Sequence, residues 1–197
     1  MRRFATLTIA PVLAGILAIT LASAPADARA ANGAMDEYAL TEAAADLAPN
    51  RFLWTDARVD GAVSVLISIP DQRAYVFRGQ TLIAASTVST GTDDKPTPTG
   101  TFTILQKKAM HRSNLYDDAP MPYMQRLTWD GVALHAGRNP GFPASHGCVR
   151  LPSAFAKKLF EATQLGATVE VTDMAYVSGG GAPLGGERGL DPLLASR

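Results

Sequence analysis

The chain has 197 residues, 47% of them hydrophobic and 18% charged, which fits a globular protein with one core and is too short for two well-packed domains. Its 18 basic and 18 acidic side chains balance, so we expect neither nucleic acid nor an anionic membrane as a partner, because both need a basic surface. The single cysteine, Cys148, excludes a framework of intramolecular disulfides.

The first 30 residues follow the pattern of a cleavable signal peptide. Arg2 and Arg3 form a basic start, residues 7–21 form an apolar run, and Ala28-Arg29-Ala30 is a small-x-small cleavage site, with Ala24 as a second possible end point. The apolar run is shorter than the ~20 residues that a spanning helix needs, which disfavours a membrane anchor. We therefore expect export, and no membrane span after cleavage.

Residues 31–60 are rich in alanine and change in character at Pro49. Residues 35–48 are predicted to form a short helix, and Phe52, Leu53 and Trp54 form an apolar anchor suited to docking on a domain. We interpret residues 31–60 as a leader or linker segment and place the folded domain at 61–174.

The next segment has the apolar spacing of strands. Valines and isoleucines alternate with smaller or polar residues over 63–69, and 74–77 and 82–90 are also predicted to be extended. Turn residues at 70–72 and 78–80 separate these three segments. Two hairpins in so short a stretch predict an antiparallel sheet built from local pairings.

A proline and a glycine give the string Thr97-Pro98-Thr99-Gly100-Thr101-Phe102 a rigid turn before a predicted strand that reaches Leu105. Residues 107–128 are too polar and too rich in proline for regular structure, and a connection of this length inside a compact domain is usually functional. Residues 129–134 form a short apolar strand that ends on His135. The imidazole is therefore expected at the end of a rigid element.

The stretch from Leu134 to Pro152 contains two of the three histidines and the only cysteine. Its glycines and prolines predict a shaped loop, and functional residues are often on such loops. A thiol with an ordinary pKa of about 8.5 becomes a good nucleophile when a neighbouring cation, base or helix N-terminus favours the thiolate. His135, His146 and a helix that begins near Ser153 are the local candidates for this activation.

Residues 154–164 are predicted to form a helix with Phe155 and Leu159 on one face, and a final strand is predicted at 167–171. Gly166 is suited to the position after the helix, because glycine readily adopts the left-handed conformation there. The glycine-rich residues 175–197 have no apolar periodicity, so we expect a disordered tail.

The string Ser145-His146-Gly147-Cys148-Val149-Arg150, with His135 thirteen residues before the cysteine, resembles the signature of the YkuD-type L,D-transpeptidase catalytic domain. Residues 97–102 are similar to a second landmark of that family, and the resemblance covers roughly 62–172. Many members have glycine directly after the first histidine, where this chain has Ala136. The family uses the backbone carbonyl of that residue to orient the histidine, so the change of side chain leaves this role intact.

The resemblance implies a mainly β fold, in which a curved antiparallel sheet closes towards a sandwich or barrel and one helix follows the catalytic loop. It implies a cysteine acyltransferase that acts on the tetrapeptide stems of peptidoglycan, in the periplasm or cell wall, with a role in wall biogenesis and cell shape. Cys148 would form a thioester with the third stem residue and release D-alanine, and an amine of a neighbouring stem would complete a 3→3 cross-link. His135 would act as the base. No cofactor is implied, and 107–128 corresponds to a substrate-covering lid.

The other residues of the motif have supporting roles in this interpretation. The backbone amides of Gly147 and Cys148 are candidates for an oxyanion hole, and Ser145 and His146 are candidates for shaping the loop. Arg150 steadies the loop or binds a substrate carboxylate, a task that suits the planar guanidinium.

Outside the motif, Tyr123 either lines the substrate site with its hydroxyl or packs in the core, and His111 is expected to face solvent. A zinc site formed by His135, His146 and Cys148 is disfavoured, because no acidic general base accompanies them in a recognised zinc motif. We therefore assign Cys148 and His135 to the chemistry and no residue to a metal.

The acyl acceptor stays open. Water would give an L,D-carboxypeptidase, and a lysine of an envelope protein would give attachment of that protein to the wall. An alternative of another class is a non-catalytic peptidoglycan-binding module. The complete pair of His135 and Cys148 favours an enzyme over that module.

Overall fold

The computed structural model describes residues 36–55, 58–113 and 118–182. The predicted signal peptide, with its two possible cleavage sites, lies outside the described residues, and so does the tail from residue 183. In the described ranges, neither helix has the length and the apolar run that crossing a membrane requires.

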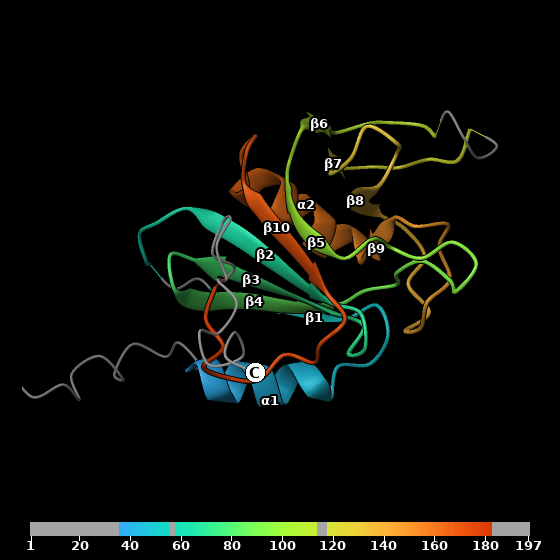
Figure 1. The fold of residues 1–197 in the computed structure, drawn as a ribbon. Helices are drawn as coiled ribbons and strands as arrows, with labels where there is room; N and C mark the ends of the chain where they lie inside the picture. The colour runs from blue at the N-terminus through green and yellow to red at the C-terminus, as the bar shows by residue number, and fades with distance from the viewer. Residues whose placement is uncertain (1–35, 56–57, 114–117, 183–197) are drawn as a thin grey trace, which may run out of the picture. The chain divides into compact units, whose positions relative to one another are not determined.

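The domain is mainly β, as predicted, with two sheets and two helices among the described residues (Figure 1). The larger sheet has the strand order β1-β4-β3-β2-β10-β5, and the smaller sheet has the order β6-β7-β8-β9. The larger sheet is made of β1 (Phe52–Trp54), β2 (Val63–Ser68), β3 (Arg73–Arg78), β4 (Thr81–Thr87), β5 (Gly100–Thr103) and β10 (Thr168–Thr172). The smaller sheet is made of β6 (Gln106–Lys108), β7 (Met124–Arg126), β8 (Ala133–Ala136) and β9 (Val149–Leu151).

Local hairpins form the antiparallel pairs β2–β3 and β3–β4, as the alternating sequence predicts. Two other pairs depart from the predicted antiparallel sheet, because β10 lies parallel to β2 and β9 lies parallel to β8. Parallel neighbours need a long crossover connection rather than a tight turn. For β8 and β9, this connection is the glycine-rich motif loop of residues 137–148.

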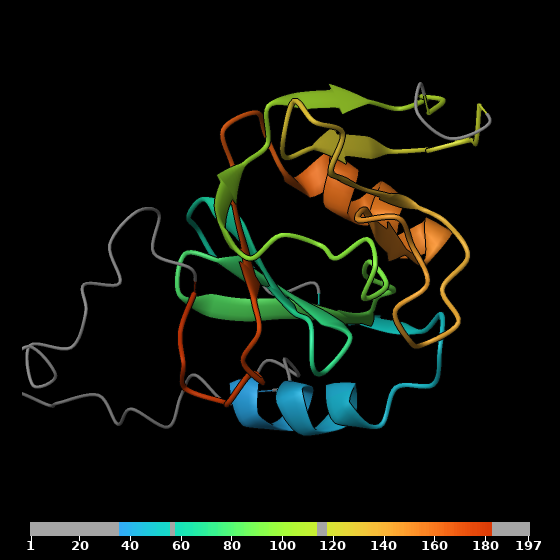
Figure 2. The ribbon, with the colours of Figure 1, turned by 45° about the vertical axis from the view of Figure 1, so that its right-hand side comes forward.

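The main core lies between the two sheets and includes one face of helix α2 (Ser153–Ala162), which confirms the predicted helix after the motif loop (Figure 2). Buried valines, isoleucines and leucines of both sheets belong to one cluster with Phe155 and Leu159 of α2. The ring of Phe155 also contacts Phe52 and Trp54 of β1, at centroid distances of 5.6 and 5.7 Å. Helix α2 therefore joins the strands of the motif loop to the larger sheet.

Helix α1 (Glu37–Ala45) covers the other face of the larger sheet. Leu40 and Ala44 pack with Leu66, Tyr75 and Phe77 in a second buried cluster. The sequence predicts a leader or linker at 31–60, whereas α1 and β1 of that segment are packed elements of the domain.

Arg73 of β3 fixes the end of α1 on the sheet. Its guanidinium donates to the carbonyl oxygens of Ala44 at 2.7 Å, Ala45 at 3.0 Å and Leu47 at 3.1 Å. These carbonyls lie at or just past the C-terminal end of α1, where a cation complements the negative end of the helix dipole.

The segment after β10 returns to α1. The Tyr176 hydroxyl and the Gly179 amide both donate to the Glu37 carboxylate, the amide at 2.7 Å. The ring of Tyr176 lies 4.3 Å from that of Tyr75, between centroids, and Ala182 is only 5% exposed. Residues 175–182 therefore pack on the domain, which differs from the disorder that the sequence predicts for this part of the tail.

Candidate active site

Two adjacent parallel strands bring the predicted nucleophile and the predicted base together. His135 is on β8, and Cys148 directly precedes β9 (Figure 1). In the register of this pair, Leu134 is opposite Val149 and His135 is opposite Arg150. The twelve residues between His135 and Cys148 thus form a connection whose two ends meet on adjacent strands.

Both side chains line one pocket of about 460 Å³. This volume is within the range of about 300–1,000 Å³ that small-molecule sites occupy. The walls come mainly from three segments: the motif loop, the β7–β8 turn, and the described residues at both ends of the connection predicted as a lid. His135 and Arg150 are added by β8 and β9. The lining residues are Ser113, Ala119, Pro120, Met121, Asp130, Gly131, Val132, His135, Gly137, Arg138, Ser145, His146, Cys148 and Arg150.

The ring of His135 is buried, with 8% of the residue exposed. Its Nδ1 lies 2.8 Å from the carbonyl oxygen of Ala136. Because a carbonyl only accepts, the neutral ring carries its hydrogen on Nδ1 and presents Nε2 as the proton acceptor. Burial lowers the pKa of His135, the hydrogen bond to Ala136 raises it, and the positive charge of Arg150 lowers it further. The imidazole is therefore neutral at pH 7, as a general base must be.

The thiol of Cys148 is half-buried, and its Sγ donates to the carbonyl oxygen of Gly131 at 3.4 Å. Burial raises the pKa of this thiol, against the lowering effects of a hydrogen bond from the Ala133 backbone and of two nearby arginines. The resting pair is thus a neutral thiol beside a neutral imidazole. A base must take the proton before the sulfur can attack.

Ser145 holds the motif loop in shape. Its buried Oγ donates to the Cys148 carbonyl oxygen and accepts from the Gly147 amide at 3.1 Å. Gly147 has a φ of 108°, which glycine adopts without the steric cost of a side chain. The Gly147 amide, which the sequence suggests for an oxyanion hole, is thus directed to Ser145. Of the two amides suggested for the oxyanion hole, the Cys148 amide remains the candidate donor.

Thr97 joins the motif loop to a second loop. Its side chain is buried, with 4% of the residue exposed. Oγ1 donates to the Gly147 carbonyl oxygen and accepts from the Gly91 amide, both at 2.9 Å. Two backbone bonds support the same junction, from Thr92 to the Ser145 oxygen and from the Ser145 amide to the Thr90 oxygen. The sequence marks Thr97 as part of a family landmark, but only the fold shows that it contacts the residue before Cys148.

Arg150 and Arg138 bring positive charge to the pocket, and His146 is an exposed member of its lining. The stem of Arg150 passes so close to Gly137 that a Cβ there would be 3.2 Å from its Cγ. Within the described part of the chain, neither arginine forms an ion pair. Both can therefore bind a carboxylate of a ligand. The sequence predicts this for Arg150 but not for Arg138, because an isolated arginine in a loop carries no pattern.

Tyr123 and His111 lie outside the lining of this pocket. The Tyr123 ring packs against the main core, 6.0 Å from the ring of Phe160 in α2. The packing alternative is therefore favoured over a substrate contact for Tyr123. His111 is half-buried and lines a smaller hollow of about 260 Å³ beside the pocket.

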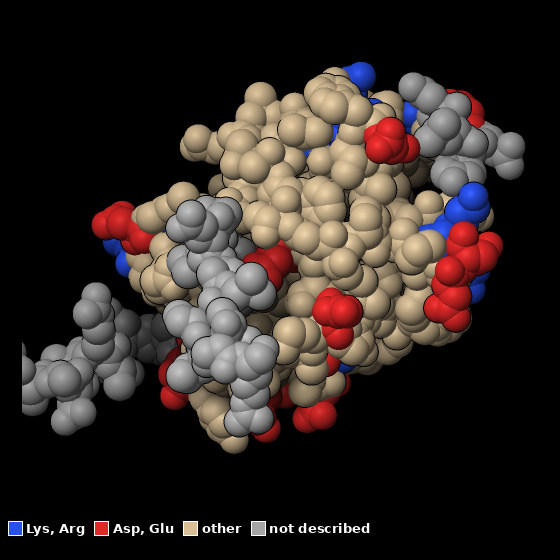
Figure 3. Space-filling view, in the orientation of Figure 1, with Lys and Arg blue, Asp and Glu red and all other residues tan. Residues whose placement is uncertain are grey.

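No group of three His, Cys, Asp or Glu side chains in the described ranges is placed to hold a metal ion. The zinc alternative of His135, His146 and Cys148 thus has no supporting geometry. On the face shown in Figure 3, Lys and Arg side chains are interspersed with Asp and Glu rather than gathered into one basic stripe. Such a surface attracts a polyanion only weakly.

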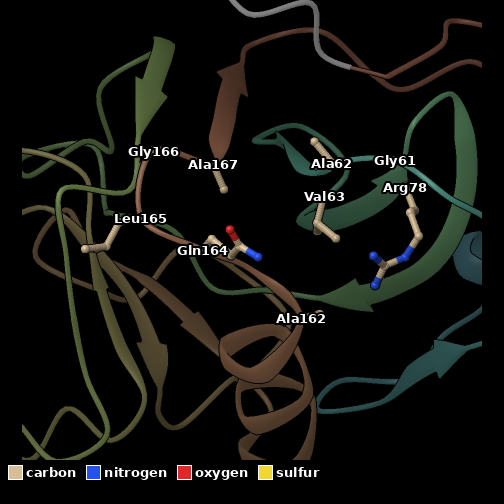
Figure 4. Close-up of a pocket in the computed structure, with 9 residues that line it drawn as sticks. All are labelled: Gly61, Ala62, Val63, Arg78, Ala162, Gln164, Leu165, Gly166 and Ala167. Carbon is tan, nitrogen blue, oxygen red and sulfur yellow. The ribbon is translucent and has the colours of Figure 1, made fainter.

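A separate hollow of about 260 Å³ lies between the start of β2 and the turn after α2 (Figure 4). The side chains of Arg78 and Gln164 point into it. Its lining includes no thiol, imidazole or carboxylate. It therefore offers neither a nucleophile nor a base for acyl transfer.

A family model for the L,D-transpeptidase catalytic domain, YkuD, matches residues 62–171. No curated protein sequence matches the chain. The fold is similar to an L,D-transpeptidase from Mycobacterium smegmatis, with 24% identity and a TM-score of 0.53, over 56% of this chain and 58% of that one. An L,D-transpeptidase from Stackebrandtia nassauensis has 24% identity and a TM-score of 0.54, over 71% of this chain and 67% of that one. The LD transpeptidase LdtMt1 in complex with imipenem has 26% identity and a TM-score of 0.52, over 56% and 59%.

Proposed function

The chain belongs to the family of L,D-transpeptidase catalytic domains, and we propose that it is a cysteine acyltransferase that cross-links the tetrapeptide stems of peptidoglycan. Cys148 attacks the carbonyl between the third and fourth stem residues, and D-alanine leaves as the thioester forms. The amine of a second stem then attacks the thioester and completes a 3→3 cross-link.

The observation that carries this proposal is that His135 on β8 and Cys148, directly before the neighbouring β9, line one pocket. Because Nδ1 of His135 is bonded to Ala136, Nε2 takes the proton of the thiol. The thiolate attacks, and the imidazolium returns the proton to the amine of the departing D-alanine. In the second step, Nε2 takes a proton from the attacking amine, the C–S bond breaks, and the proton returns to Sγ.

The charge of the pocket supports a donor with carboxylates. Arg138 and Arg150 both line it, and neither has an acidic partner within the described residues. A guanidinium binds a carboxylate through two parallel hydrogen bonds, which fixes orientation as well as affinity. We assign these two arginines to the terminal carboxylate of the donor stem.

A wall substrate requires action outside the cytoplasmic membrane. The proposal therefore includes export by the signal predicted in residues 1–30 and a location in the periplasm or cell wall, with a role in wall biogenesis and cell shape. The N-terminus of the exported protein tests this part. It should begin directly after Ala30 or Ala24, and an intact N-terminus in the exported fraction would contradict cleavage.

A carbapenem tests the nucleophile, because its strained lactam is a reactive acyl donor and one similar protein was solved in complex with imipenem. The intact mass of the protein should increase by one imipenem. Cys148→Ala should show no adduct, whereas His111→Ala, outside the pocket, should match the unaltered protein. An adduct that persists in Cys148→Ala would contradict the assignment.

Purified disaccharide tetrapeptide tests the acceptor. A transpeptidase releases D-alanine and forms a dimer joined through two third-position residues, and a carboxypeptidase releases D-alanine and stops at the tripeptide. Attachment to a lysine of an envelope protein would give a mixed product when that protein is added. A protein that sediments with wall sacculi but forms no adduct and no product would be a binding module instead.

A further inference from the structure

A second hollow shares part of its lining with the pocket of Cys148, along the β7–β8 turn. This is the hollow of about 260 Å³ that His111 lines. Ser113, Met121, Asp130 and Gly131 line both spaces and so form the border between them. The thiol of Cys148 donates to the carbonyl oxygen of Gly131, at this border. An acyl group on the sulfur therefore lies beside the Gly131 backbone, one residue away from Asp130 in the sequence.

Asp130 is the only carboxylate among the described residues that line either space. The nearby Asp118 is held in an ion pair with Arg112 at 3.0 Å, whereas Asp130 is exposed and has no ion pair in the described ranges. Beside it, Trp129 is 72% exposed and lines the second hollow, with Arg126 over its ring at 5.9 Å. Because Arg126 already lies over the indole ring, the attraction for an organic cation comes from the charge of the free Asp130 carboxylate.

The turn itself does not need the carboxylate of Asp130. Backbone bonds close it, from the Leu127 amide to the Val132 oxygen at 2.8 Å and from the Gly131 amide to the Thr128 oxygen at 3.3 Å. The side chain that supports the turn is Thr128, whose Oγ1 accepts from the Val132 amide at 3.2 Å. Asp130 is therefore free to serve a ligand.

We propose that Asp130 selects the acyl acceptor by binding the ammonium group of the second stem, and so favours cross-linking over hydrolysis. This inference rests on the proposed function. Primary amines of this kind have a pKa of about 10, so the acceptor reaches the site protonated. Docked at Asp130, it loses one proton to solvent, attacks the thioester carbonyl and passes a second proton to His135, which delivers it to Sγ as the C–S bond breaks. The products are an amide and the free thiol, and the charges balance.

Asp130→Asn tests this proposal, because Asn-Gly forms a tight turn as readily as Asp-Gly and only the charge is lost. With disaccharide tetrapeptide as donor and acceptor, the ratio of dimer to tripeptide should fall about tenfold, a typical effect of a charge-assisted hydrogen bond. Asp130→Glu should keep most of the ratio. Asp173→Asn, an exposed aspartate after β10, is the matched control and should change nothing. Added salt should lower the ratio in the unaltered protein more than in Asp130→Asn.

Hydroxylamine is a nucleophile that is largely neutral at pH 7.5, so its reaction with the acyl-enzyme does not depend on the charge of Asp130. It therefore distinguishes a lost charge from a distorted turn. The yield of hydroxamate from the acyl-enzyme should be similar in Asp130→Asn and in the unaltered protein. An equal loss with hydroxylamine and with the stem amine would overturn the ammonium role and indicate a damaged turn. An unchanged ratio of dimer to tripeptide in Asp130→Asn would also overturn the ammonium role of Asp130. So would tripeptide as the only product of the unaltered protein. Neither result would contradict the proposed acyltransferase function. Absence of any thioester in the unaltered protein would instead defeat the proposed function itself.

Discussion

The larger sheet and the smaller sheet are held together in different ways. In the larger sheet, β2, β3 and β4 are six or seven residues long and are joined by short turns, with α1 on one face and α2 near the other. In the smaller sheet, the strands have three or four residues, and the segment between β8 and β9 is irregular. Side chains such as Ser145 and Thr97 fix that segment, together with a few backbone bonds to Thr90 and Thr92.

This contrast indicates that stability and chemistry depend on different residues. Core strands and helices open only at a free energy near that of global unfolding, whereas loops open locally at lower cost. A loop fixed by a few side-chain bonds places a nucleophile accurately while contributing less to the core. Substitutions around the motif loop should therefore change rates more than stability, and substitutions around α1 should do the reverse.

Cys148→Ala should have the largest effect on rate. It removes the proposed nucleophile, so both D-alanine release and imipenem adduct formation should disappear. The melting temperature should change by only a few degrees, because one atom of a half-buried side chain is lost. A thermal melt and an intact-mass assay check both parts. A collapsed melt would instead assign Cys148 a mainly structural role.

His135→Ala should slow acylation by a factor of about 10² to 10⁴, the usual contribution of a positioned base. The control is His111→Ala, which should leave the rate of acylation nearly unchanged because the His111 ring does not line the Cys148 pocket. Equal losses at the two positions would mean that the base is misassigned.

The pH dependence should follow the lowered pKa of His135. Burial favours the neutral ring, so acylation should rise with pH through a midpoint below the ordinary histidine value of about 6.5. The same shift stabilises the fold above pH 6.5, and this contribution is lost as the pH falls through the pKa of the folded state. Both predicted directions, a rate and a stability that rise with pH, are checked by measuring acylation rates and melting temperatures from pH 5 to 8. The unaltered protein is compared with His135→Gln. A midpoint above 6.5 would contradict the buried neutral base.

Thr97→Val should have an intermediate effect, because it removes a positioning contact and no reacting group. The Gly147 carbonyl and the Gly91 amide would both lose a buried partner, at a cost of about 1–3 kcal/mol each. We expect acylation to slow by about 10- to 100-fold, in line with that loss. Thr97→Ser keeps the hydroxyl and should restore most of the rate. A loss of stability with an unchanged rate of acylation would show that the hydrogen bonds of Thr97 do not position Cys148.

Much of the fold was predictable where local pattern and local pairing coincide. The alternation over 63–69 and the turn residues after it predict β2, β3 and β4, and Phe155 and Leu159 predict the buried face of α2. The pairings of β10 with β2 and of β9 with β8 join residues far apart in sequence, and no local pattern encodes them. Helix α1 resembles a leader in sequence because its alanines form a weak apolar face, and only the buried face of the larger sheet shows what it covers.

The site divides in the same way. A dense string of unusual residues marks Cys148 and His135, and the fold places them together. Asp130, Arg138 and Thr97 lie on separate segments that meet only in three dimensions, so no local sequence pattern shows that they come together around the Cys148 pocket. For Tyr123 the sequence left open a substrate contact or core packing, and its ring packs on Phe160.

Tyr176→Phe should have the smallest effect and tests the separation of the two regions most directly. It deletes the hydroxyl that donates to Glu37 and keeps the ring that stacks on Tyr75, so stability should fall by about 1 kcal/mol. The melting temperature should drop by a few degrees, and Glu37→Gln should reproduce most of that drop, because both substitutions weaken the same bond. The rate of imipenem acylation should be unchanged, since neither residue lines the pocket of Cys148. A slower acylation with an intact melt would show that the packing of α1 is coupled to the motif loop through the larger sheet.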